Sequence, residues 1–151
     1  MQSAALSILL LALPAVLLVA QRADPEPSPK LGPEAVVRIQ VEAFQTGADG
    51  IATAFRFASP SNRAVTGPLP RFEAMIRTGY ADLLTFERAE YGDLRVQGEE
   101  AAQRVMLVQR DGARSAYVFG LSRQRGGACN GCWMTDAVVP IEPPASETFR
   151  I

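Results

Sequence analysis

The spacing of apolar residues changes near Phe86, and this change limits the fold more than any other feature of the chain. Before Phe86, apolar side chains recur at helical spacing. After it they tend to alternate, and turn residues recur at short intervals. Helices that precede a run of strands indicate an α+β domain with the helices on one face of the sheet. The chain of 151 residues is long enough for one such domain.

The segment before Phe86 predicts about three helices. The first begins at Pro33 or Glu34, because proline suits the first helical position and an acidic residue complements the helix dipole. The second follows an N-cap at Asp49, and the third follows the rigid segment 67–70. The three helices are expected to end at Gly47, at residues 59–62 and at Gly79.

The segment from Phe86 onward predicts four antiparallel strands joined by short links. A bulge near Gly92 and Asp93 interrupts the first strand, and Asp111-Gly112 is a strong hairpin signal. The expected strands cover residues 86–97, 102–109, 114–123 and 132–139. The α+β domain therefore spans residues 33–140, and residues 141–151 form a flexible tail.

The N-terminus predicts export or membrane anchoring. Residues 1–20 carry no charged side chain, and residues 6–20 are nearly all apolar and end in a small residue, which is typical of a secretory signal peptide. The run also approaches the length that spans a bilayer, so an uncleaved membrane anchor is the alternative. Residues 21–32 hold alternating prolines and predict an extended tether. We therefore expect the protein in the periplasm or cell envelope.

Charge and composition exclude several classes of site. The formal net charge is -1, so no basic surplus favours nucleic acid as a partner. The chain has no histidine, which excludes serine–histidine and cysteine–histidine triads and any zinc site that needs imidazole. We predict no cofactor and no metal.

Cys129 and Cys132 are the two cysteines of the chain. We favour a local disulfide, which fits an oxidising compartment and would constrain the unfolded chain by about 2 kcal/mol. A redox dithiol is the alternative, although such cysteines usually sit at a helix N-terminus and here a strand pattern follows. A zinc site would need Asp136 and another carboxylate, or a second chain.

Asp136 lies in the last predicted strand, whose two faces are both rather apolar. Strict alternation places Thr135 on one face, and Asp136 and Val138 on the other. A carboxylate in an apolar pocket can act as a general acid or base. A solvated or arginine-paired aspartate at a strand edge is the reading we favour.

The order of elements resembles the NTF2-like, or cystatin-like, α+β superfamily. Five strings also resemble a more specific group, the domain-of-unknown-function family 4864: Pro33–Val37, Ala54–Pro60, Arg71–Phe72, Leu121–Gln124 and Cys129–Asp136. The resemblance implies a curved sheet cupped against helices, often around an apolar pocket. It also makes a homodimer through the sheet plausible. The superfamily includes both isomerases and binding domains, so the fold does not choose between them.

Superfamily isomerases pair a carboxylate base with phenol donors, which makes Asp136 with Tyr80 or Tyr91 a candidate catalytic set. The sequence nevertheless holds no complete catalytic constellation. We therefore favour a non-catalytic domain that binds a small apolar ligand or another envelope protein. A pocket enzyme of isomerase or dehydratase type, and a thiol-redox protein using Cys129 and Cys132, are the alternatives.

Overall fold

A computed structural model describes residues 23–145 of the chain. The leader over residues 1–20, its apolar run 6–20 and the last residues of the tail, 146–151, lie outside the described residues. Within the described part, helices precede strands as an α+β fold requires. The helices are α1 (Pro33–Phe44), α2 (Ala48–Arg56), α3 (Pro60–Thr66), α4 (Leu69–Gly79) and α5 (Asp82–Thr85).

The strands form one antiparallel sheet in the order β1-β2-β3-β4, so each strand pairs with its neighbour in sequence. The strands are β1 (Arg88–Gln97), β2 (Glu100–Val108), β3 (Arg114–Arg123) and β4 (Trp133–Ile141). The α+β class with a four-stranded antiparallel sheet is confirmed. The predicted bulge is also present, because the pairing of β1 with β2 shifts between Tyr91 and Leu94.

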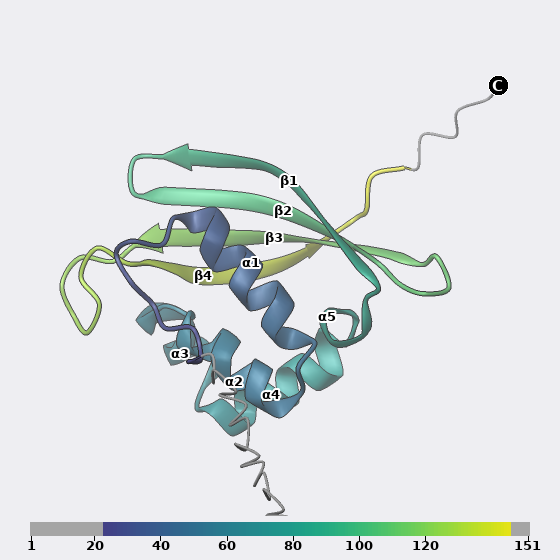
Figure 1. Cartoon of the computed structure of the whole chain (residues 1–151), viewed down its shortest axis with the longest axis horizontal. Helices are drawn as coiled ribbons and strands as arrows, with labels where there is room; N and C mark the ends of the chain where they lie inside the picture. Colours follow the sequence, from purple (N-terminus) through teal and green to yellow (C-terminus); the bar gives the residue numbers. More distant parts are fainter. Residues whose placement is uncertain (1–22, 146–151) are drawn as a thin grey trace, which may run out of the picture.

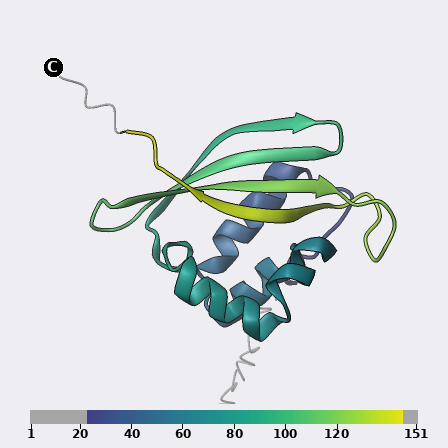
Figure 2. The same ribbon diagram turned by 180° about the vertical axis from the view of Figure 1, so that it is seen from behind.

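All the helices lie on one side of the sheet in both views (Figures 1 and 2), and α1 runs directly beneath the strands. Helix α1 buries Val37, Val41 and Phe44 at helical spacing. These side chains meet the inner face of the sheet, where Phe119 of β3 is fully buried in the same core. The main core therefore fills the space between the helices and one face of the sheet.

The prediction of about three helices is wrong, because the described residues form five helical segments. Residues 59–62, expected only to end a helix, also begin α3. Ser59 Oγ accepts a hydrogen bond from the backbone N–H of Asn62 at 3.2 Å, and Pro60 occupies the first helical position. Ser59 and Pro60 thus begin α3, whereas α2 already ends at Arg56. The second unexpected segment, α5, is a single turn.

Strand β4 also departs from its prediction. It runs from Trp133 to Ile141 and not over residues 132–139. It includes Pro140, which an edge strand tolerates because the missing N–H can face away from the neighbouring strand.

A register shift breaks the alternation that we expected along β4. Gly120 pairs with Ala137 and Leu121 pairs with Thr135, so Asp136 is the extra residue of a bulge. Consequently Thr135 and Val138 both face the helices, although strict alternation put them on opposite faces.

The described part of the tether, residues 23–32, contains no strand and leads into α1. It is fastened to the domain, because Arg56 at the end of α2 forms ion pairs with Asp24 and Glu26 at 3.4 and 3.3 Å. Leu31 packs against the core. Among the described residues, none of the helices has both the length and the apolar character needed to cross a membrane.

Candidate functional site

A cavity of about 490 Å³ opens between the helices and strand β4. Helices α1, α3, α4 and α5 and strand β4 all contribute to its walls. Most of the lining side chains are apolar: Phe44, Ala58, Val65, Phe72, Met75, Ile76, Leu83, Ala137 and Val138. The polar ones are Gln40, Ser61, Asn62, Thr66, Tyr80, Thr135 and Asp136.

One wall of the cavity forms where the connection between α2 and α3 pairs with β4. Ala58 and Thr135 make a parallel bridge. The Thr135 N–H donates to Phe57 O at 2.9 Å, and the Ser59 N–H donates to Thr135 O at 2.8 Å. Asn62 Nδ2 adds a second bond to Thr135 O at 3.0 Å. The strings Ala54–Pro60 and Cys129–Asp136 are therefore in direct contact.

A buried pair of polar side chains ties this wall to α1. Gln40 Nε2 donates to Ala54 O at 2.9 Å, and Thr135 Oγ1 donates to Gln40 Oε1 at 2.5 Å. Both side chains are almost fully buried. Each oxygen and nitrogen of the pair has a partner inside the domain, as buried polar groups require. These two residues line the cavity, but they chiefly hold α1, α2 and β4 together.

Asp136 is the charged side chain of the cavity lining, and it lies partly exposed at the α3 side. Ser61 Oγ donates to Asp136 Oδ1 at 3.4 Å, which is long for a hydroxyl donor. Within residues 23–145, Asp136 forms no ion pair with an arginine or lysine. The carboxylate thus lines the cavity without a cationic partner from the described residues.

The structure brings Tyr80 but not Tyr91 to this cavity. Tyr80 lines it, and its Oη donates to Val138 O at 3.2 Å, two residues from Asp136. Tyr91 lies on β1, where the Arg38 guanidinium stacks over its ring at 4.0 Å. Burial raises the pKa of Tyr91 above its usual value of 10.0, and the nearby Glu42 carboxylate raises it further. Asp136 makes no hydrogen bond with either phenol among the described residues.

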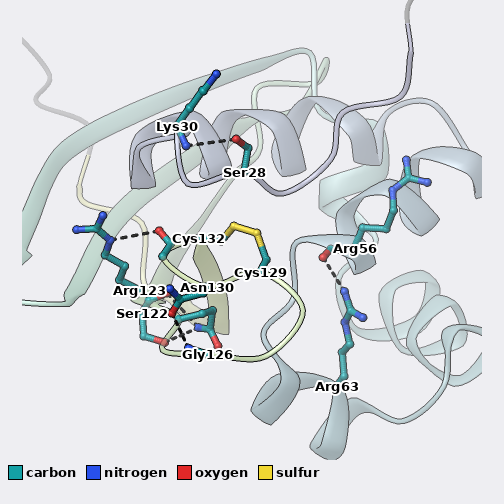
Figure 3. Close-up of a disulfide and its surroundings, with 12 residues drawn as sticks. Ser28, Lys30, Arg56, Arg63, Ser122, Arg123, Gly126, Cys129, Asn130 and Cys132 are labelled. Atoms are coloured by element: carbon teal, nitrogen blue, oxygen red, sulfur yellow. Dashed lines mark hydrogen bonds between the residues drawn. A yellow bond between two sulfur atoms is a disulfide. The ribbon is translucent and has the colours of Figure 1, made fainter.

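Cys129 and Cys132 lie at disulfide distance in the loop between β3 and β4, with Cα atoms 5.6 Å apart. Figure 3 shows them beside the tether residues Ser28 and Lys30. A Cβ placed on Gly131 would meet the Pro29 ring at 3.6 Å. The pair therefore closes the loop at the point where Gly131 lies against the tether.

The two cysteines lie in a loop and not at the start of a helix. Cys132 is fully buried and directly precedes β4. Backbone bonds close the loop, because Gln124 N–H donates to Cys132 O at 2.7 Å and Gly131 N–H donates to Gln124 O at 2.8 Å. Over residues 23–145, no three cysteine, aspartate or glutamate side chains gather closely enough to hold a metal ion.

Sequence reasoning missed five polar residues of the cavity lining: Gln40, Ser61, Asn62, Thr66 and Thr135. Ser61 and Asn62 looked like a helix terminator, and the Ser-Pro signal before them could have predicted α3. No sequence signal shows which residues face β4, since the partner of Asn62 lies 73 positions later in the chain.

Comparison with known proteins gives a family but no characterised relative. No curated protein matches the chain. The model of a family described as a domain of unknown function, DUF4864, matches residues 29–146. The matched region includes all five helices, the four strands and the cavity-lining residues of the described structure. The chain therefore belongs to the DUF4864 family.

Proposed function

We propose that this protein is a non-catalytic binding module that holds a small, mainly apolar ligand in the cavity between its helices and β4. One observation carries the proposal: the cavity has a volume of about 490 Å³ and mostly apolar walls. Ligand sites typically have volumes of about 300 to 1,000 Å³ and combine apolar walls with a few polar groups.

The hydrogen bonds that the polar lining residues already make support a binding function over a catalytic one. Gln40 and Thr135 bond to each other and to the backbone, and Tyr80 donates its proton to Val138 O. The described lining contains no cysteine, lysine or arginine, and Ser61 has no imidazole base in a chain without histidine. A cysteine or lysine nucleophile and a histidine-activated serine are therefore missing from the lining that the structure describes.

We further propose that the protein is exported, or anchored to the membrane, and that it works in the periplasm or cell envelope. The apolar run 6–20 and the proline-rich segment that follows it support this. Helices on one face of a four-stranded antiparallel sheet are in keeping with an NTF2-like fold. A homodimer through the open face of the sheet remains a prediction, as does an envelope protein as partner.

One observation favours a second candidate function. Asp136 and Tyr80 line the same cavity, which is the arrangement that an isomerase or dehydratase would use. In that case Asp136 would be the base, and Tyr80 would turn from Val138 O to polarise a substrate carbonyl. Turnover of carbonyl substrates that Asp136→Asn abolishes would favour this enzyme over the binding module.

Filling the cavity tests the binding module directly. The full-length protein is titrated with the apolar fluorophore Nile red, and decanol is added as a competitor. Met75 lines the cavity, so Met75→Trp should weaken binding by about tenfold or more because the indole occupies ligand space. Met106→Trp makes the same change on β2, outside the lining, and should bind like the original protein.

Two results would contradict the proposal. One is a wild-type protein that binds neither Nile red nor decanol. The other is Nile red binding that survives unchanged in Met75→Trp, which would place the probe elsewhere on the surface.

A further inference from the structure

Most polar groups of the cavity lining lie on α3 and β4, whereas the lining residues on α1, α4 and α5 are mainly apolar. The rim formed by α3 and β4 carries Ser61, Asn62 and Asp136. The walls formed by α1, α4 and α5 carry Phe44, Phe72, Met75, Ile76 and Leu83. A ligand that fills the cavity would therefore meet polar groups at one end and apolar side chains along its remaining length.

The spare hydrogen-bonding capacity of this rim consists mainly of acceptors. The Asn62 amide nitrogen already donates to Thr135 O, and Tyr80 Oη already donates to Val138 O. Thr135 O is fully used, because it accepts from Asn62 and from the backbone N–H of Ser59. What remains are the second amide N–H of Asn62 and lone pairs on the Asn62 amide oxygen, on Tyr80 Oη and on the Asp136 carboxylate. A ligand group that donates hydrogen bonds would therefore match most of these positions.

The rim carries a negative charge, which a positively charged hydrogen-bond donor would complement. Asp136 is the charged residue of the lining, and within residues 23–145 it has no cationic partner. Its one side-chain contact, with Ser61 Oγ, is 3.4 Å long. A carboxylate at the mouth of an apolar cavity attracts a cation more strongly than one in open solvent, because the surrounding medium screens it less.

We infer that the cavity takes an amphiphile with a protonated amine at one end. The ammonium group would sit at the α3–β4 rim and donate to Asp136 and Asn62, while the apolar part would lie along Phe44, Phe72 and Leu83. This inference rests on the proposed binding function and adds the chemical class of the ligand.

Three ligands with the same alkyl chain and different head groups test the inference. Decylamine is a cation at neutral pH, decanol is neutral and decanoate is an anion. Each is made to compete with Nile red on the full-length protein at low salt. We expect decylamine to bind about fivefold to tenfold more tightly than decanol, and decanoate to bind least, because Asp136 is partly exposed.

Two variants separate Asp136 from the general acidity of the protein. Asp136→Asn should remove most of the difference in affinity between decylamine and decanoate, and it should change the affinity for decanol least. Asp93→Asn removes the same charge from an exposed position outside the cavity and should preserve the order of the three ligands. Added salt should also reduce the preference for decylamine in the unmodified protein, which needs no variant to fold.

The outcomes distinguish the inference from the proposed function. Equal affinities for the three ligands, or a preference for decylamine that persists in Asp136→Asn, would overturn the inference and leave the binding function intact. If none of the three displaces Nile red, the binding function fails and the inference fails with it.

Discussion

Thr135 uses every polar atom it has, and its bonds reach three separate parts of the helical layer. Its backbone N–H and C=O bond to Phe57 and Ser59, and its hydroxyl donates to Gln40 on α1. The residue is almost completely buried. Because a lost partner at so buried a position leaves a polar atom without a hydrogen bond, each bond matters more than it would at the surface.

Replacing Thr135 with valine should destabilise the domain markedly. The shape of the side chain is retained, but Gln40 Oε1 loses its donor and becomes a buried unsatisfied acceptor. We expect the free energy of unfolding to fall by about 1 to 3 kcal/mol. Urea denaturation measures it, and Thr78→Val on the exposed end of α4 is the matched control. Equal stability of the two variants would contradict this role of Thr135.

Tyr117 should make stability depend on pH in the alkaline range. Burial raises the pKa of Tyr117 above its usual value of 10.0, and the carboxylate of Asp82 raises it further. Above pH 10 or so, the phenol therefore loses its proton first in the unfolded chain. This difference stabilises the unfolded state, so the protein loses stability as the pH rises through that range.

The phenylalanine variant tests this prediction. Urea denaturation near neutral pH and above a pH of about 10 should show a smaller alkaline loss of stability in Tyr117→Phe than in the original protein. The pKa of Tyr91 is raised as well, so part of the alkaline loss should remain in Tyr117→Phe. An identical alkaline loss in both proteins would refute the role of Tyr117.

At the scale of elements, Arg63 joins the end of α2 to α3. Its Nε donates to Ala58 O at 3.0 Å and its Nη2 donates to Arg56 O at 2.6 Å. The guanidinium also lies 5.0 Å from the centre of the Phe55 ring. It thereby satisfies carbonyls that the last turn of a helix leaves without an internal partner.

Arg63→Lys should lower stability although it keeps the charge, because an ammonium group cannot make both directed bonds and stack on the ring. We expect a loss of about 1 to 2 kcal/mol in urea denaturation. Arg77→Lys on α4 is the control, since Arg77 only pairs with Glu73 at the surface and should change stability by less than about 0.5 kcal/mol. If Arg63→Lys changed the free energy of unfolding as little as Arg77→Lys, only the charge of Arg63 would matter for stability.

The sequence predicts a helix or strand correctly where its local signals agree. The prediction fails where one short motif is compatible with two structures. Strand β3 matches its prediction because alternating apolar residues and a flanking Asp-Gly turn both mark it. Helix α3 was missed because Ser59-Pro60, which suits the end of one helix, here caps the start of another. The bulge at Asp136 contains no glycine and follows from the pairing of β4 with β3, which sequence spacing does not reveal.

The sequence likewise predicted some residues of the candidate site and not others. Asp136 and Tyr80 could be selected by residue type, since carboxylates and phenols are rare in apolar surroundings. The role of Gln40 could not be predicted, because its hydroxyl partner lies 95 positions away in sequence. Long-range partners of this kind depend on how α1 lies against β4.

At the scale of the whole molecule, the export proposal makes a prediction about the mature chain. Protein taken from cells is alkylated without reductant and its intact mass is measured. We expect a chain that begins near Gln21 and carries no alkyl group, because export would remove the leader and oxidise Cys129 and Cys132. A full-length chain with two alkylated thiols would argue against export into an oxidising compartment.

The position of β4 in the chain has a consequence for synthesis. The ribosome completes α1 to α5 and then β1 to β3 before it reaches Trp133, yet Asp136 and the β4 side of the cavity belong to this last strand. A nascent chain that stops short of β4 has the apolar walls of the cavity but not the strand that closes it. Ligand would therefore bind, and stabilise, only finished copies of the domain.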